Sequence, residues 1–309
     1  MKRLFIPIIV MAALLTACGH RASNAQSGDK DSATVDSMPI PNVPIELTLD
    51  TIQYEKEDSI ATVKISIIWP KNGPEALVAS IRQYICEELA SEPVMGEEKP
   101  KVKLYDDGQE AVQALVDTAY NELTASWKEA KNDGIPNDMT YSCYVKISKL
   151  EETDLYITYL SNHEGFQGGA HGYATASYQT FRKRDGLRIG YQTKFNRETE
   201  QFEKQNQNLF KDPQSPELAQ LIKEGVRSYF KDGEQDVATD EALKDMLIGV
   251  DDVNAIPLPS NAPSFTKQGL TFVYQQYEIA PYAAGIINFD LPLDKVRPYL
   301  TKEAAELIK

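Results

Sequence analysis

Residues 141–159 read YSCYVKISKLEETDLYITY, and this stretch indicates two neighbouring β-strands. Apolar residues alternate with polar ones in both halves of the stretch: Tyr141, Cys143, Val145 and Ile147 in the first half, and Leu155, Ile157 and Tyr159 in the second. This period of two predicts strands with one buried face. The polar residues 151–154 between the two runs suit a turn, so we expect an antiparallel pair.

The neighbouring segments extend this pattern. Residues 173–181 are predicted to form a third strand, and Arg184-Asp185-Gly186 after it suits a hairpin turn. Upstream, residues 62–69 alternate in the same way and predict another half-buried strand. The apolar residues of 74–89 and 109–130 instead follow helical spacing, which predicts two amphipathic helices.

The second half of the chain repeats this mixture. Ser215-Pro216 supplies a cap and a first-turn proline for one helix, and Thr239 caps a short helix that should stop at Gly249. Strands are predicted at 264–267, 270–278 and 284–291. Because strands outnumber helices and no βαβ alternation is sustained, the sequence predicts an α+β fold in which antiparallel β-sheet packs with a few helices.

The N-terminus has the pattern of a bacterial lipoprotein signal. Met1-Lys2-Arg3 is basic, residues 4–15 form an apolar run too short to span a bilayer, and Leu15-Thr16-Ala17-Cys18 closes it. The pattern predicts cleavage before Cys18 and lipid on this cysteine, so that the membrane is a partner through Cys18. An ordinary secretory signal with an incidental cysteine is the other interpretation.

Four segments follow from these features. Residues 1–17 are the signal peptide and 18–44 a flexible tether, because that stretch is polar and small with prolines at its end. Residues 45–198 and 199–309 are an N-terminal and a C-terminal α+β part, with one continuous globular unit as the alternative. Gly19 follows the lipidated cysteine in place of the Asp of the usual inner-membrane retention rule. By resemblance to that rule, we expect the outer membrane of the cell envelope, with the leaflet left open.

The charge of the chain limits its partners. The formal net charge is −14, and loss of Lys2 and Arg3 with the signal peptide makes it −16. We do not expect this protein to bind nucleic acid, because phosphate contacts need a basic face. The acidity can serve solubility alone, or it can attract a cationic partner.

Two cysteines remain after Cys18. Cys86 belongs to a predicted helix and Cys143 to the apolar face of a predicted strand. They can pair in an oxidising compartment, or they can be two buried thiols that pack as small hydrophobic groups. The second interpretation is favoured, and the sequence leaves the redox state open.

The segment 162–172, NHEGFQGGAHG, is the densest cluster of special residues. A functional interpretation makes His163, Glu164 and His171 metal ligands. Their spacing argues against this, because there is no helical His-x-x-x-His pair and no further ligand cluster, so we expect no metal and no cofactor. The structural interpretation places Gly168 and Gly169 in a bulged strand connection with His171 hydrogen-bonded beside it.

A second notable segment is 272–285, FVYQQYEIAPYAAG. A strand runs into a turn that Pro281 and Gly285 make possible, and a second strand follows. Tyr274, Tyr277 and Tyr282 can form an amphipathic binding surface. They can also pack on the sheet as part of a hairpin, which is the favoured interpretation.

Together these two segments carry a resemblance. The GGAHG after a strand and the distal YEIAPYAAG resemble the extracytoplasmic, lysozyme-binding domain of RsiV-type anti-sigma factors, which also occurs as the N-terminal, non-catalytic domain of certain peptidoglycan deacetylases. The positions that match the family pattern are Gly168, Gly169, His171, Tyr277, Pro281, Tyr282 and Gly285. The resemblance covers roughly residues 46–300 and implies an α+β fold and binding of a wall-active protein or glycan. No sigma-binding segment or deacetylase domain accompanies it, so neither of those activities is implied.

We therefore expect a lipid-anchored envelope protein that binds a lysozyme-like protein or a cell-wall glycan and is not an enzyme. The seven matching positions are its candidate binding residues, although they can also serve mainly to set the fold. No Gly-x-Ser-x-Gly elbow or phosphate-binding loop is present. The alternatives are an enzyme that acts on wall glycan through paired carboxylates and a structural protein of envelope assembly.

Overall fold

The computed structural model describes residues 46–91, 102–135, 138–196 and 201–308, and among these it does not describe the side chains of 194–196, 201 and 202. The predicted signal peptide, tether and Cys18, and the predicted boundary at 198/199, lie outside the described residues. Residues Val43–Lys309 form one compact unit. In the part of the chain that the structure describes, no helix is long and apolar enough to cross a membrane.

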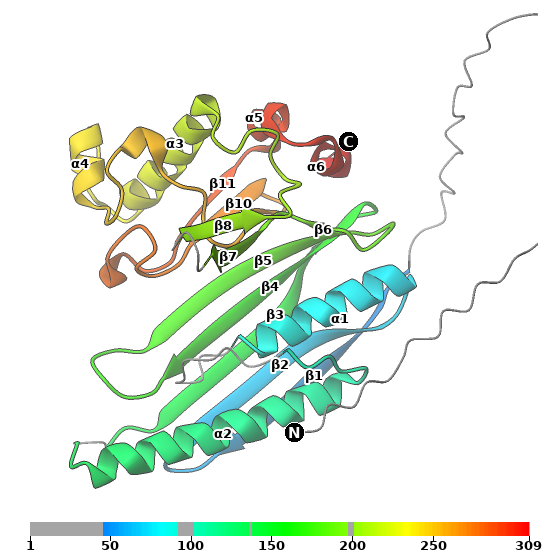
Figure 1. The fold of residues 1–309 in the computed structure, drawn as a ribbon, viewed down its shortest axis with the longest axis vertical. Helices are drawn as coiled ribbons and strands as arrows, with labels where there is room; N and C mark the ends of the chain where they lie inside the picture. Colours follow the sequence, from blue (N-terminus) through cyan, green and yellow to red (C-terminus); the bar gives the residue numbers. More distant parts are fainter. Residues whose placement is uncertain (1–45, 92–101, 136–137, 197–200, 309) are drawn as a thin grey trace, which may run out of the picture. The chain divides into compact units, whose positions relative to one another are not determined.

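The largest element is a sheet of six strands in the order β1-β2-β3-β4-β5-β6 (Figure 1). Its strands are β1 Thr48–Glu57, β2 Ala61–Asn72, β3 Tyr141–Glu152, β4 Tyr156–Phe166, β5 Tyr173–Arg182 and β6 Arg188–Ile189. The predicted strand pair of 141–159 is confirmed as β3 and β4, with Val145 opposite His163. The predicted third strand and the turn after it are confirmed as β5 and the connection to β6, where Gly186 has a φ of 69°.

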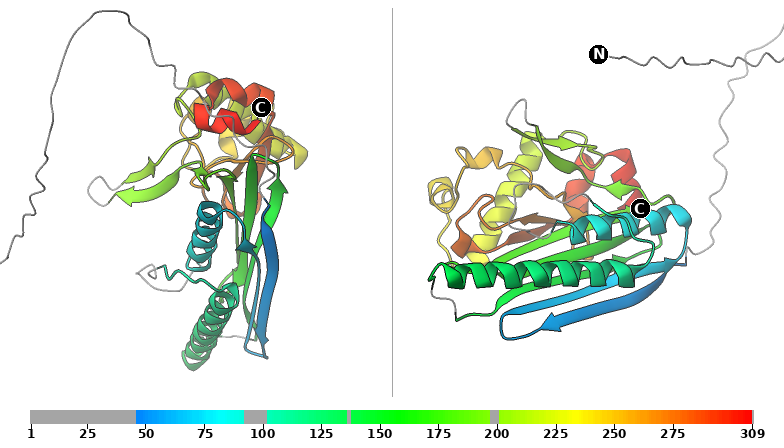
Figure 2. Two further views of the ribbon diagram at one scale, coloured as in Figure 1. Left: turned by 90° about the vertical axis from the view of Figure 1, so that its right-hand side faces the viewer. Right: turned by 60° about the horizontal axis from the view of Figure 1, so that its bottom comes forward.

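One strand pair departs from the antiparallel expectation. β2 and β3 are parallel, with Val63 beside Cys143. Parallel neighbours need a long crossover, and here the chain provides it through α1 (Glu75–Leu89) and α2 (Gly108–Asn132). Both helices lie on the same side of the sheet (Figure 2). The α+β class is therefore confirmed, but the sheet is mixed.

The apolar stripes that predicted these helices form the first hydrophobic cluster. Leu77, Ile81 and Ile85 of α1 are buried against Val63, Ile65 and Ile67 of β2 and other residues of the same cluster. Asp107 caps α2 by accepting hydrogen bonds from the backbone N–H groups of Gln109 and Glu110. At its other end Gly134 has the positive φ expected of a helix stop.

Strand β1 was not predicted from the sequence. It pairs with β2 along its whole length, but it has only half-buried or exposed residues, including Ile52. An edge strand contacts the core weakly, so its sequence lacks the clear alternation of a half-buried strand.

The C-terminal elements are β7 Gln192–Asn196, β8 Gln201–Gln205, α3 Pro216–Asp232, α4 Asp240–Asp245, β9 Ser264–Phe265, β10 Leu270–Tyr274, β11 Ile287–Leu291, α5 Leu293–Val296 and α6 Lys302–Ala305. The helices and the strands β9–β11 contribute buried residues to the second hydrophobic cluster. Ser215 and Thr239 cap α3 and α4 as predicted, but α4 stops at Asp245, before the expected end at Gly249. The sheet here has the order β11-β10-β9.

A small threonine network joins this sheet to β4 and β5. Thr158 Oγ1 donates to the carbonyl oxygen of Phe265 at 2.7 Å and lies 2.8 Å from Thr180 Oγ1. The Phe265 N–H donates to Thr180 Oγ1 at 2.9 Å. This end of β4 is consequently covered on both faces.

The double coverage corrects the alternation predicted for residues 155–159. Tyr156 and Thr158 are buried along with Ile157 and Tyr159, whereas Leu155 is 42% exposed just before the strand begins. A strand packed on both faces loses the period of two that a half-buried strand shows.

Cys86 and Cys143 are both buried thiols, as the favoured interpretation had it. Cys86 lies in α1 and Cys143 in β3, and both belong to the first hydrophobic cluster. Burial raises the pKa of the Cys86 thiol. The protonated form is therefore favoured, which makes Cys86 a poor nucleophile.

Candidate functional site

The structure brings the two sequence motifs together. Gly168, Gly169 and His171 lie in the loop between β4 and β5, and Tyr277 and Tyr282 lie in the loop between β10 and β11. The rings of His171 and Tyr282 stack, with centroids 3.8 Å apart and an interplanar angle of 23°. The Tyr277 ring lies 6.3 Å from that of His171 and 5.8 Å from that of Tyr282. We call these three side chains the His171–Tyr277–Tyr282 cluster.

Hydrogen bonds hold the cluster to the β4–β5 loop. His171 Nδ1 lies 2.8 Å from the carbonyl oxygen of Gly172, and the Tyr282 hydroxyl donates to the same oxygen at 3.1 Å. Because a carbonyl oxygen only accepts, Nδ1 must have the proton in this contact. In the neutral ring Nε2 is then an acceptor, and the Tyr277 hydroxyl lies 3.4 Å from it.

The glycines of the first motif shape this loop. Gly168 has a φ of +90°, and a Cβ there would lie 2.5 Å from the hydroxyl oxygen of Tyr141. Gly169 has a φ of +88° but open space around it. Both positions need a left-handed backbone, and Gly168 also needs the missing side chain. The expected strand connection is observed as the hairpin loop between β4 and β5, and its register shows no bulge in these strands. These glycines shape the loop without offering a functional group.

The second motif, residues 272–285, also determines the backbone conformation of its loop. Strand β10 ends at Tyr274, four residues before the predicted end, because the chain turns at once. The Gln275 N–H donates to Glu278 Oε2 at 2.7 Å and the Glu278 N–H to the Gln275 carbonyl oxygen at 3.0 Å. Within this turn Tyr277 has a φ of 65°, which is unusual for a side chain of this size.

Two glutamine side chains then act as a strand partner for β5. Gln275 Nε2 donates to the carbonyl oxygen of Ala176 at 2.7 Å, and the Ala176 N–H donates to Gln275 Oε1 at 3.0 Å. The Ala174 N–H donates to Gln276 Oε1 at 3.2 Å. These side-chain amides thus satisfy backbone groups that the edge of β5 would otherwise expose.

Tyr277 and His171 are exposed, whereas Tyr282 is half-buried. Tyr277 differs from His171 in its backbone conformation. Tyr277 is 57% exposed. Its positive φ is a backbone conformation that costs on the order of 1–3 kcal/mol. An exposed aromatic residue in a strained turn contributes little to the core. It is therefore the position in this cluster with the clearest potential to contact a ligand.

A groove of about 740 Å³ lies on the other side of the same loop. Its apolar lining residues are Tyr229, Phe230, Met246, Pro281, Ala283 and Ala284, and its charged ones are Asp232 and Asp245. Asp232 is the last residue of α3 and Asp245 is the last residue of α4. Both carboxylates therefore lie at helix C-termini, where the helix dipole is also negative. The lining residues include no lysine or arginine. We call this the Asp232–Asp245 groove.

The loop is held against this groove. The Tyr229 hydroxyl donates to the carbonyl oxygen of Ala284 at 2.6 Å. Gly285 follows with a φ of +73°, which lets the chain turn into β11. Pro281 thus lines the groove, whereas Tyr282 belongs to the His171–Tyr277–Tyr282 cluster. Gly285 is a turn residue.

The structure separates the three residues considered as metal ligands. His163 is buried, with 5% exposure, and its Nε2 lies 2.7 Å from Ser161 Oγ and 3.5 Å from Glu88 Oε2. Glu164 follows on the opposite face of β4, and His171 lies in the loop beyond. Among the described residues, no group of three or more His, Cys, Asp or Glu side chains is placed to hold a metal ion.

Several residues of these surfaces were not singled out from the sequence. Gln275 and Gln276 stand as an adjacent pair directly after an apolar strand, a visible signal whose role depends on where β5 lies. Asp232 and Asp245 are two among 46 acidic residues. Nothing local distinguishes them, because helices α3 and α4 bring them together.

The fold and these contacts define a class: an α+β module whose two motif loops meet in an exposed aromatic cluster beside an acidic groove. Residues 207–294 match a family model described as a protein of unknown function, DUF3298. This match runs from before α3 into α5 and contains Tyr277, Pro281, Tyr282 and Gly285. A comparison with curated proteins found no match.

Two solved structures share the fold. A member of the DUF3298 family from Bacteroides fragilis is 20% identical, with a TM-score of 0.59, over 84% of this chain and 96% of its own. A DUF3298 family protein from Pseudomonas aeruginosa is 12% identical, with a TM-score of 0.52, over 85% of this chain and 97% of its own. At these identities the likeness is one of fold, and it extends beyond the matched residues 207–294.

Proposed function

We propose that this protein is a binding module of the bacterial cell envelope, anchored in the outer membrane by lipid on Cys18, that captures a basic, lysozyme-like protein. The proposal combines the N-terminal signal pattern, the resemblance carried by the two motifs and the surface beside the second motif. A cell-wall glycan is the other ligand class for the same envelope role.

The Asp232–Asp245 groove is the observation that favours a protein over a glycan as the ligand. Its apolar floor suits an aliphatic or aromatic side chain, and its two carboxylates suit a lysine or arginine beside that side chain. The net charge of −14 favours encounter with a cationic partner over a wide range of orientations. The exposed Tyr277 on the same loop would extend the contact.

A carboxylate-dependent enzyme is the less favoured function. Such an enzyme needs two carboxyl groups at one cleft, one of them with a raised pKa. Among the described carboxyl groups, burial raises the pKa of Glu122. Glu122 belongs to α2 and does not line the groove.

The test is calorimetric titration of residues 19–309 with a c-type lysozyme at low and then at moderate salt. We expect saturable binding that survives moderate salt, because the groove adds apolar contact to charge attraction. The double variant Asp232→Asn/Asp245→Asn should weaken binding at least tenfold. Binding that disappears with salt would reduce the interaction to general charge attraction, and absence of binding would remove the proposal.

A matched control separates the groove from net charge. Asp138 and Asp154 are exposed aspartates that do not line the groove. The double variant Asp138→Asn/Asp154→Asn removes the same charge and should change the affinity less than twofold. Equal losses in the two double variants would contradict a role for the groove.

A further inference from the structure

The face of the main sheet opposite α1 and α2 contains a second hollow. In Figure 2 no helix of the described residues covers this side of strands β1–β4. A depression of about 800 Å³ lies there across the four strands. It is distinct from the Asp232–Asp245 groove, because the two share no lining residue.

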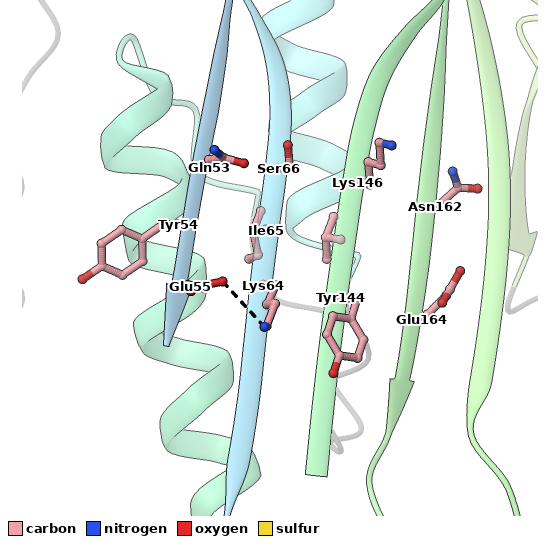
Figure 3. A pocket seen from close by; sticks show the side chains of 11 residues that line it. Gln53, Tyr54, Glu55, Lys64, Ile65, Ser66, Tyr144, Lys146, Asn162 and Glu164 are labelled. Atoms are coloured by element: carbon pink, nitrogen blue, oxygen red, sulfur yellow. Dashed lines mark ion pairs between the residues drawn. The ribbon is translucent and has the colours of Figure 1, made fainter. Parts of the chain in front are cut away.

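Strand register places the side chains of this depression in two rows. The first row crosses from β1 to β4 through Glu55, Lys64, Tyr144 and Glu164. The second row crosses in the same direction through Gln53, Ser66, Lys146 and Asn162. We call the hollow that these eight residues line the open-face depression (Figure 3). On β5 the rows continue to Ala174 and Ala176, whose side chains are small.

The charges of the open-face depression balance. It has two lysines and two glutamates, in a chain whose net charge is −14. Lys64 pairs with Glu55 at 3.7 Å and with Glu57 at 3.0 Å, and these carboxylates raise the pKa of Lys64. Lys146 and Glu164 form no ion pair with any described residue. The depression thus offers hydrogen-bonding groups with no net charge to attract an ionic partner.

Tyr144 lies at the centre of this surface. Its side chain is 40% exposed, between Lys64 and Glu164 in the first row. A flat ring face surrounded by amide, hydroxyl, ammonium and carboxylate groups matches the two-sided chemistry of a sugar. The C–H face of a pyranose packs on an aromatic ring, and its hydroxyl groups both donate and accept hydrogen bonds.

We propose that the open-face depression binds an uncharged, hydroxyl-rich oligosaccharide of the N-acetylhexosamine type, with the ring of Tyr144 as the stacking platform. Asn162 and Glu164 accept from the sugar hydroxyls, and Lys146 and Asn162 donate to its oxygens. The inference rests on the proposed envelope location, but it does not require the groove to capture a protein.

The test uses residues 19–309 and the N-acetylglucosamine tetramer as probe, followed by calorimetry and by NMR of the backbone amides. We expect saturable binding, with the largest amide shifts on β2, β3 and β4 around Lys64, Tyr144 and Asn162. Tyr144→Ala should weaken binding at least tenfold. Asn162→Ala, which keeps the ring, should weaken it several-fold. Thermal unfolding of each variant establishes that it is folded.

Tyr54 is a matched control for Tyr144. It is 38% exposed and also lines the depression, at its β1 edge, but it pairs with the inward-facing Ile65, and its ring points away from the ring of Tyr144 (Figure 3). Tyr54→Ala should change the affinity less than twofold. Equal effects of Tyr54→Ala and Tyr144→Ala, or no saturable binding of the tetramer, would overturn the inference.

The two binding proposals can fail separately. Tyr144→Ala should leave lysozyme binding unchanged, and Asp232→Asn/Asp245→Asn should leave tetramer binding unchanged. If lysozyme binds and the tetramer does not, the open-face inference is wrong while the proposed function stands. If the tetramer binds and lysozyme does not, the choice of a protein ligand is wrong and the glycan is the ligand class.

Discussion

His171 and Tyr282 stack ring on ring, with centroids 3.8 Å apart, and this contact joins the two motifs of the sequence. His171 belongs to the β4–β5 loop of the main sheet and Tyr282 to the β10–β11 loop of the C-terminal sheet. A stacked pair adds about 0.5–1.5 kcal/mol beyond the area that it buries. The contact therefore stabilises the packing of the two loops as well as forming part of a surface.

Tyr282→Ala should lower the free energy of unfolding by about 1–2 kcal/mol, because it removes the ring on His171 and the hydroxyl hydrogen bond to Gly172. Urea denaturation measures the change. Tyr277→Ala is the control, because Tyr277 is mostly exposed, and it should change stability by less than about 0.5 kcal/mol. Similar losses in the two variants would show that stacking does not distinguish these tyrosines.

Gly168→Ala should destabilise the protein more than Gly169→Ala. Both glycines have nearly the same φ, so both variants incur backbone strain of about 1 kcal/mol. Only at Gly168 does the new Cβ meet the Tyr141 hydroxyl, at 2.5 Å. Thermal unfolding of Gly168→Ala in wild-type and Tyr141→Phe backgrounds isolates this clash. The prediction fails if Tyr141→Phe does not recover part of the loss.

Gln275→Ala should speed hydrogen exchange at the Ala176 amide, because that N–H loses its acceptor. Gln276→Ala should do the same at Ala174. Each variant serves as the control for the other, and native-state exchange by NMR resolves both amides. If exchange at neither amide changes, the side chains do not act as a strand partner for β5.

Alkaline pH should destabilise the protein partly through Tyr191 and Tyr274. Burial raises the pKa of both phenols well above the usual value near 10, and each donates to a proline carbonyl oxygen, Tyr191 to Pro259 at 2.6 Å and Tyr274 to Pro257 at 2.7 Å. Their folded forms keep the proton while their unfolded forms lose it. This stability is therefore present below about pH 10 and is lost as pH rises above it, by about 1.4 kcal/mol per pH unit for each phenol.

Urea denaturation between pH 9 and 11 tests this dependence. Tyr191→Phe should reduce the decline of stability with pH, whereas the exposed Tyr277→Phe should leave it unchanged. The same decline in wild type and Tyr191→Phe would contradict the assignment. Tyr274→Phe provides a second, independent variant for the same comparison.

Local patterns in the chain were sufficient for the elements that contact one core on one face. The alternation of Val63, Ile65 and Ile67 and the helical spacing of Leu77, Ile81 and Ile85 are both confirmed, because each residue faces a single apolar layer. The caps Ser215 and Thr239 are confirmed for the same kind of reason, since a cap contacts only the first turn of its own helix. The α+β class follows from these elements.

Long-range packing decided the remainder. The parallel pairing of β2 and β3, the burial of both faces at Tyr156 and Thr158, and the edge strand β1 all depend on neighbours distant in sequence. The two motifs were recognisable as unusual sequences, but that His171 stacks on Tyr282 could be known only from the packed sheets. The acidic pair Asp232 and Asp245 and the two rows around Tyr144 have no local signature at all. These residues share a surface only because the fold brings their helices and strands together. The hydrophobic pattern of a sequence shows which face of each helix or strand is buried, but it does not show which elements are neighbours.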